Sequence, residues 1–190
     1  MSDLIEIRWH GRGGQGAVTA SEVLAEAALH EDKYFQAFPD YGPERMGAPI
    51  RAYTRISSSP IHQHHQITEP DVVVVLDPTL MGVVDFTEGL DDDGLLVVNT
   101  PLPPSELRQK LGFRKGKVFT VDATRVALDT MKRNITNTPM VGALLKALEV
   151  VKKDVVRDEI KSRFNARVSE EVAKANVVAF ERAYDEVKEG

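Results

Sequence analysis

The chain has 190 residues, of which 42% are apolar, and a formal net charge of −5. Its length predicts a single domain over residues 1–190, with a core at 1–150 and a helical extension at 151–190. Because the chain has no cysteine, it cannot form disulfides, thiolate nucleophiles or cysteine-bound iron–sulfur clusters. The acidic balance argues against a nucleic-acid-binding protein.

No apolar stretch approaches the roughly 20 residues that span a bilayer. The first residues, Met1–Asp3, lack the basic segment and apolar run of a secretion signal. We therefore expect a cytoplasmic protein with no membrane contact.

A glycine-rich turn lies between a predicted strand and a predicted helix. Leu4–Trp9 has apolar residues at alternate positions, and Ala17–Leu29 is an alanine-rich run with helical periodicity. Between them stands Gly11–Gly16, where glycines let a ligand approach the N–H groups at the helix start. This order predicts a site for an anion.

The spacing of Gly11, Gly13 and Gly16 is that of dinucleotide-binding turns, which need an acidic residue about 20 positions later. Gln36 stands near that position, so the nicotinamide interpretation is weakened. Two interpretations remain open: the turn binds an anion, or it only lets the helix pack closely on the sheet.

Two further strands are predicted on either side of a loop rich in glycine and proline. Lys33–Phe38 is the first, ended by Pro39, and Ile50–Ile56 is the second. In the second strand Arg51, Tyr53 and Arg55 share one face. That face is either a solvated edge or a surface under an anionic ligand or a partner.

Three histidines follow this strand, at positions 62, 64 and 65. No carboxylate or fourth ligand stands at a convincing spacing nearby. We interpret them as surface or interface residues and predict no metal site.

The middle of the chain predicts buried parallel strands. Asp71–Asp77 is an unbroken β-branched run, typical of a strand covered by helices on both faces. One or two short helices are expected in Thr79–Leu90, then a strand at Gly94–Asn99. A helix ending at Leu111 and a last strand at Gly116–Asp122 complete a Rossmann-like, doubly wound α/β sheet that is mainly parallel.

The remaining segments are predicted to be helical. Ala123–Met131 is one helix, and a second begins at Thr138 with a capping hydroxyl before Pro139. Two more helices follow, and the last is expected to pack through a stripe formed by Val172, Ala175, Ala179, Ala183 and Val187. The segment Arg133–Asn137 either caps a helix or offers polar contacts to a ligand.

Catalytic motifs are scarce. The sequence has no serine nucleophile turn and no metal-binding histidine pair at helical spacing, and no lysine completes the glycine turn as a nucleotide-binding loop. His10 is a possible general base, although a histidine after a strand is more often a packing residue. We predict no catalytic residue in this chain.

Together these segments resemble the gamma subunit of pyruvate and related 2-oxoacid:ferredoxin oxidoreductases. The resemblance rests on the turn at Gly11–Gly16, the segment 38–49 with the strand 53–57, the segment 70–78, and Asn137–Ala143. It covers the chain nearly end to end. One departure is Met46, where the family pattern leads us to expect a second arginine.

The resemblance implies a reaction in which a 2-oxoacid, coenzyme A and oxidised ferredoxin give acyl-CoA, CO2 and reduced ferredoxin. It implies that thiamine diphosphate, magnesium and 4Fe–4S clusters belong to partner chains, namely alpha, beta and ferredoxin-like delta subunits. This chain would be non-catalytic and would help to receive coenzyme A.

The residues expected to contact coenzyme A are Gly11, Arg12, Gly13, Gly14, Gln15, Gly16, Arg45, Asn134 and Thr138. Backbone amides and arginines are the donors that suit phosphate groups. The alternative from another class is a stand-alone NAD(P)-binding reductase that uses the same turn.

Overall fold

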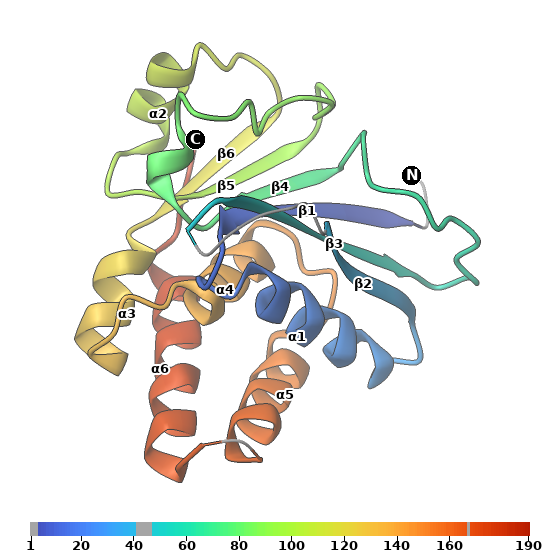
Figure 1. The fold of residues 1–190 in the computed structure, drawn as a ribbon, viewed down its shortest axis with the longest axis vertical. Helices are drawn as coiled ribbons and strands as arrows, with labels where there is room; N and C mark the ends of the chain where they lie inside the picture. The colour runs from blue at the N-terminus through green and yellow to red at the C-terminus, as the bar shows by residue number, and fades with distance from the viewer. Residues whose placement is uncertain (1–3, 41–46, 167) are drawn as a thin grey trace.

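The computed structural model describes residues 4–40, 47–166 and 168–190. Within these residues one sheet lies between two unequal layers of helices (Figure 1). Its strands are β1 (Ile5–Arg12), β2 (Tyr34–Asp40), β3 (Pro49–Ser57), β4 (Val72–Val75), β5 (Leu95–Asn99), β6 (Lys117–Val121) and β7 (Lys188–Glu189). The helices are α1 (Ala17–Leu29), α2 (Pro104–Leu111), α3 (Ala123–Met131), α4 (Asn137–Ala147), α5 (Lys153–Asn165) and α6 (Glu170–Glu186).

The strand order is β2-β3-β1-β4-β5-β6-β7. Strands β1, β4, β5 and β6 are mutually parallel, whereas β3 runs antiparallel to both β1 and β2, and β7 runs antiparallel to β6. The predicted α/β fold with a mainly parallel sheet is confirmed. Two features were not predicted: β3 separates β1 from β2, and β7 continues the sheet beyond β6.

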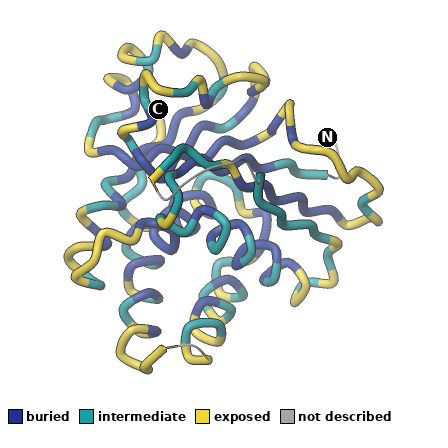
Figure 2. Tube along the Cα trace, viewed as in Figure 1, coloured by how far each residue is buried: buried dark blue, intermediate teal, exposed yellow. Residues whose placement is uncertain are grey.

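Apolar residues fill both sides of the sheet. On the side of α1 and α3 to α6 the core includes Trp9, Leu24 and Phe180, all fully buried. The smaller core on the other side includes Leu96 and Leu107 of α2. Figure 2 shows the central strands of the sheet buried between the two layers. Residues 151–190, predicted as an extension, contribute to the larger core.

Strand β2 runs past the predicted stop at Pro39 and ends at Asp40. The prediction was wrong because β2 pairs only with β3 and is therefore an edge strand. Proline is tolerated there, since its missing N–H would have faced away from the partner strand.

The face of β3 that carries Tyr53 and Arg55 is not a solvated edge. The exposed fractions of these residues are 1% and 0%, because β3 lies between β1 and β2. The Arg55 Nε donates to Glu6 Oε1 at 2.6 Å, and its guanidinium lies over the Phe38 ring. Only Arg51 of the three remains exposed.

Of the one or two short helices predicted in Thr79–Leu90, the structure has a single 3-10 helix at Pro78–Leu80; the rest of this segment, which is described throughout, consists of turns. Gly82 and Gly89 adopt positive φ angles of 82° and 74°, which end helical turns. A Cβ on Gly89 would lie 1.9 Å from the carbonyl oxygen of Thr68. The close backbone approach therefore requires glycine.

Two helix details differ from the prediction. Helix α4 begins at Asn137, and Thr138 does not cap it, because Thr138 already lies inside the first turn. In α6 the buried residues are Ala173, Asn176, Ala179, Phe180 and Ala183, while Val172 is exposed. Among the described residues no helix has both the length and the apolarity to cross a membrane.

Candidate functional site

The glycine turn connects the end of β1 to the start of α1. Gly14 and Gly16 have φ angles of 95° and 83°, a conformation that residues with a Cβ rarely adopt. A Cβ on Gly16 would lie 2.7 Å from Asn137 Nδ2. The close contact at Gly16 is therefore between α1 and α4 and not with the sheet, which was the packing expected from the sequence.

Two backbone N–H groups of the glycine turn have no acceptor within the described residues. The Gly13 amide donates to the Ala48 carbonyl at 2.9 Å, and the Gln15 amide donates to the Arg12 carbonyl at 3.0 Å. Within the described residues the amides of Gly14 and Gly16 donate no hydrogen bond. Helix α1 has neither a capping side chain nor an acidic residue in its first turn. Its positive end is therefore uncompensated, which favours an anion.

Arg12 is held by its neighbours rather than free to meet a ligand. Its Nε lies 3.3 Å from Asp77 Oδ2 and 3.0 Å from Thr79 Oγ1. Its terminal nitrogens donate to the carbonyls of Gly47 and Thr79, at 3.2 and 3.4 Å. Arg12 therefore fixes the turn to the segments that follow β4 and precede β3.

Asp77 is the common acceptor below the turn. Its Oδ2 also accepts from Gln15 Nε2 at 2.6 Å, and its Oδ1 accepts from the Thr79 amide at 2.8 Å. Burial alone would raise the pKa of this carboxyl, but these hydrogen bonds and the charge of Arg12 outweigh it and lower the pKa. Asp77 is therefore ionised at neutral pH and neutralises Arg12.

Replacing Asp77 by alanine is expected to lower the free energy of unfolding by about 2 kcal/mol, because three donors lose a buried acceptor. Asp85 is a matched control, since it accepts from the Thr87 amide two residues later in the same way but on the surface. Asp85→Ala should cost well under half as much. Urea unfolding of the two variants measures the difference, and equal losses would contradict a central role for Asp77.

The other predicted ligand contacts lie in different settings. Asn134 is exposed in the loop before α4. Thr138 is buried, and its hydroxyl donates to Asn176 Oδ1 at 2.9 Å. Arg45 lies outside the described residues. The structure therefore gathers Gly11–Gly16 into one turn and does not bring the Thr138 hydroxyl to it.

Two residues at the turn stand outside the set expected to contact coenzyme A. Asp77 was recognised only as a strand end, whereas Asn137 belongs to the segment Arg133–Asn137, which was predicted either to cap a helix or to offer polar contacts to a ligand. Asp77 follows β4 and Asn137 begins α4. Both lie at the carboxyl edge of the parallel strands, where ligand sites are expected in such sheets. The short Asp-Pro-Thr sequence after a buried strand was the available signal for Asp77.

The histidines do not form a metal site among the described residues. The side chains at 62, 64 and 65 are exposed, as their surface interpretation predicted.

His10 is buried, and its Nε2 accepts from Arg8 Nε at 3.1 Å. Burial first, and then the charges of Arg8 and Arg51, lower its pKa to about 3. It is neutral at physiological pH.

The sheet order bears on the nicotinamide alternative. In dinucleotide-binding folds the acidic residue for the ribose stands at the end of the strand next to β1. Here that neighbour is the antiparallel β3, and Asp40 ends β2, one strand further away. Asp40 also accepts hydrogen bonds from Tyr53 and Gln66 and pairs with Arg51. Asp40 is therefore one strand too far from β1 for a ribose contact, and its carboxylate is already engaged by neighbouring side chains.

Comparison with known proteins identifies the family of this chain. Residues 6–186 match the family described as pyruvate ferredoxin/flavodoxin oxidoreductase. The chain belongs to this family. Among its relatives in the family, the common gamma subunit of the pyruvate/ketoisovalerate oxidoreductases of Pyrococcus abyssi is 52% identical, over 94% of this chain and 97% of the relative. The pyruvate synthase subunit PorC of Thermotoga maritima is 49% identical, over 96% and 94%.

Solved structures of the family have the same fold. The pyruvate oxidoreductase subunit PORC of Thermotoga maritima superposes with a TM-score of 0.87 at 46% identity, covering 100% of this chain and 99% of that one. The gamma subunit of a keto/oxoacid ferredoxin oxidoreductase from Geobacter sulfurreducens gives 0.72 at 25% identity, covering 96% and 97%. This chain therefore has the fold of a gamma subunit of the family, as the sequence resemblance implied.

Proposed function

We propose that this chain is the coenzyme A-receiving gamma subunit of a pyruvate:ferredoxin oxidoreductase complex. In that reaction the bond between the carboxyl and the carbonyl carbon of the 2-oxoacid breaks, CO2 leaves, and the acyl group forms a thioester with coenzyme A. Two electrons pass to ferredoxin. The relatives named above are subunits of pyruvate/ketoisovalerate oxidoreductases and of a pyruvate synthase, which supports this substrate class.

The observation that carries the coenzyme A role is the pair of unused amides at the turn. Gly14 is exposed, and the Gly14 and Gly16 amides have no acceptor in the described residues, at the start of a 13-residue helix. Phosphate oxygens are suited to such amides because the helix end carries a partial positive charge. In this proposal Arg12 holds the turn in shape, and the Arg45 side chain is a candidate for direct charge pairing.

The redox chemistry is proposed to belong to partner subunits. With no cysteine in its sequence, this chain has no thiolate ligand for a 4Fe–4S cluster. Thiamine diphosphate with magnesium, which stabilises the carbanion formed on decarboxylation, is assigned to the alpha and beta subunits and the clusters to a ferredoxin-like delta subunit. What this chain's own residues do is bind and orient the acyl acceptor.

Replacing Gly14 by alanine is expected to weaken coenzyme A binding to the assembled complex at least about 10-fold, because a Cβ would stand where phosphate approaches the amides. Gly82→Ala is the control: Gly82 also has a positive φ, and a Cβ at this position would have no atom within 4 Å. Isothermal titration calorimetry of the reconstituted complex measures both. Equal affinities in the two variants would refute the role of the turn.

The subunit role has its own test. The isolated chain should not reduce ferredoxin with pyruvate and coenzyme A, and activity should appear only when the partner subunits are added. A stand-alone NAD(P)-binding reductase would instead bind NADH tightly in a fluorescence titration and turn over alone. Turnover by the isolated chain would overturn the proposal.

A further inference from the structure

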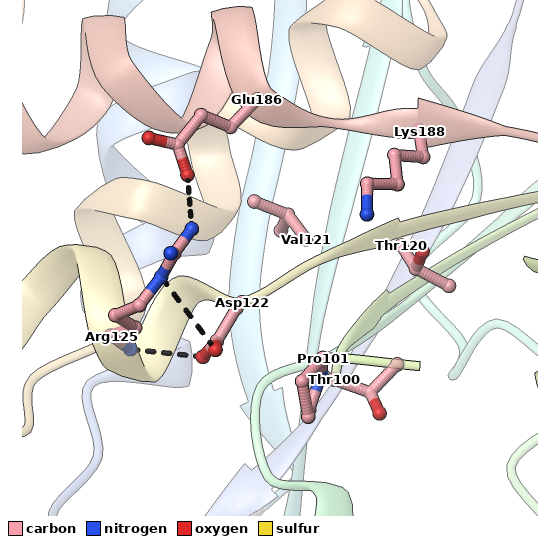
Figure 3. A pocket seen from close by; sticks show the side chains of 8 residues that line it. All are labelled: Thr100, Pro101, Thr120, Val121, Asp122, Arg125, Glu186 and Lys188. Carbon is pink, nitrogen blue, oxygen red and sulfur yellow. Dashed lines mark hydrogen bonds and ion pairs between the residues drawn. The ribbon is translucent and has the colours of Figure 1, made fainter. Parts of the chain in front are cut away.

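The carboxyl edge of the sheet has a pocket besides the glycine turn, at the ends of β5 and β6 (Figure 3). Its volume is about 390 Å³, and the charged side chains that line it are Asp122, Arg125, Glu186 and Lys188. Arg125 is paired with Glu186 at 2.8 Å. Because two cations and two carboxylates line this pocket, their charges cancel and do not select an anion.

The glycine turn differs, because two helix starts meet there. Gly16 directly precedes α1, and Asn137 is the first residue of α4. Neither helix has a side-chain cap or an acidic residue in its first turn. The nearby Asp77 carboxylate is already paired with Arg12. Two partial positive charges therefore lie close together, and one anion between them would compensate both.

The side chain of Asn137 is held in one orientation. Its Oδ1 accepts from the Thr138 amide at 2.8 Å, and the Thr138 hydroxyl donates to Asn176 Oδ1 at 2.9 Å. A backbone N–H only donates, so the carboxamide atom that it contacts is the oxygen and the other is the nitrogen. The Nδ2 group therefore lies against Gly16, 2.7 Å from the position that a Cβ on this glycine would take.

This Asn137 nitrogen is a donor without an acceptor. The residue is 6% exposed, and its Nδ2 makes no hydrogen bond within the described residues. In the described part of the chain, Arg55 Nη2 is the only enclosed side-chain nitrogen or oxygen without a partner. The Asn137 Nδ2 is therefore accessible, beside the partly exposed Gly16. A free donor on a side chain that is buried and held in place has the properties of a ligand contact.

We propose that Asn137 is a specificity-determining residue of the coenzyme A site. Its Nδ2 group donates to the same phosphate group as the Gly14 and Gly16 amides, so that this phosphate bridges the starts of α1 and α4. The inference rests on the proposed coenzyme A role of the turn. Three donors from two helices suit a tetrahedral group with several charged oxygens, and hydrogen bonds to a charged acceptor are the stronger ones.

The first test is a titration of the full chain with inorganic phosphate, followed by two-dimensional proton–nitrogen NMR, which detects backbone amides and asparagine NH2 groups. The Gly14 and Gly16 amide signals and the Asn137 side-chain signals are expected to shift together, with one dissociation constant. Shifts of the glycine amides alone would overturn this inference and leave the role of the turn intact. No shift of any of the three would also overturn it, while calorimetry of Gly14→Ala in the complex decides the coenzyme A role separately.

Substitutions test the contact in the assembled complex. Asn137→Ser keeps a side-chain oxygen near the Thr138 amide and removes the NH2 group without adding charge, so coenzyme A binding is expected to weaken at least about 10-fold. Asn137→Asp keeps the shape of the side chain but replaces the donor by a carboxylate oxygen, and should weaken binding further because like charges repel.

The control is Asn165→Ser, since Asn165 is exposed at the end of α5. This variant should bind coenzyme A as tightly as the wild type. Isothermal titration calorimetry of the reconstituted complexes measures all three variants, and equal affinities of Asn137→Ser and Asn165→Ser would overturn the proposal. The phosphate titration uses the wild-type chain, so its result does not depend on how the variants fold.

Discussion

Replacing Gly142 by valine is expected to lower the free energy of unfolding by at least about 3 kcal/mol, the largest loss that we predict for a single substitution in this chain. Gly142 lies in α4 where this helix crosses α6. A Cβ at this position would stand 2.2 Å from the carbonyl oxygen of Phe180 and 3.1 Å from its carbonyl carbon. These are backbone atoms of a helix, so no side-chain rotation relieves the clash and the two helices must separate.

For the change in the free energy of unfolding at Gly142, helix propensity alone would predict the opposite sign. Glycine in a helix interior is about 1 kcal/mol less favourable than alanine, so Gly142→Ala would stabilise an isolated α4. In the folded chain it should destabilise, and Gly142→Val should destabilise further.

The matched control is Lys146→Val in the same helix, where the side chain is exposed. This change reports the propensity cost of a β-branched residue, about 0.5 kcal/mol, together with loss of the contact between the Lys146 ammonium and the Tyr184 ring. Urea unfolding monitored by circular dichroism measures all three variants. A Gly142→Ala protein as stable as the wild type would show that α4 and α6 are not in close contact at this position.

His10 is expected to make the protein lose stability as the pH falls below about 6.5. Its folded-state pKa is about 3, whereas an unfolded histidine titrates near 6.5. Between these values the unfolded chain binds a proton that the folded chain does not, so stability rises with pH in this window. The slope is about 1.4 kcal/mol per pH unit, and the loss from pH 6.5 to 4.5 is about 2 kcal/mol.

The surroundings of His10 explain why it resists protonation. Arg8 donates to its Nε2, Arg51 stands opposite it on β3, and the Phe86 ring packs edge-on at 6.2 Å between centroids. The carboxylate of Asp85 acts in the other direction but is the smallest contribution. A protonated imidazole here would face the Arg8 guanidinium at hydrogen-bond distance in a buried position.

The control for this prediction is His10→Gln, which keeps an acceptor for Arg8 and does not titrate. Denaturant unfolding measured from pH 4.5 to 7.5 should give a steep pH dependence for the wild type and a flatter one for the variant. Asp77, whose pKa is lowered, loses its contribution only at more acidic pH, so it does not mimic the histidine. Parallel curves for the two proteins would contradict a neutral, buried His10.

Local chemistry made several elements predictable from the sequence. Helices α1 and α3 have the predicted bounds, Ala17–Leu29 and Ala123–Met131, because their periodicity and flanking residues act within a few positions. Strand β4 was recognised from its β-branched run, which is typical of a sheet covered on both faces, and β1 was recognised from its alternating apolar residues. The glycine turn followed from the strand, the glycines and the helix that surround it.

Other features depend on residues that are distant in sequence. Arg55 is buried only because β3 inserts between β1 and β2, where Glu6 and Gln36 receive its guanidinium. Val172 is exposed because α6 meets α4 through Asn176 and Phe180 instead. A pattern within one strand or helix does not specify which face a distant partner covers.

The sequence by itself determined the α/β class, the family resemblance and the place of the glycine turn, since these follow from residue order within short segments. Only the tertiary structure decided that Arg12 is bound to Asp77, that Asn137 packs against Gly16, and that Lys188 lies opposite Thr120 in the β6–β7 pair. Each of these pairs is separated by at least 60 positions in the chain. Their contacts form when the ends of strands and helices meet at one edge of the sheet, and that meeting depends on the packing of the whole chain.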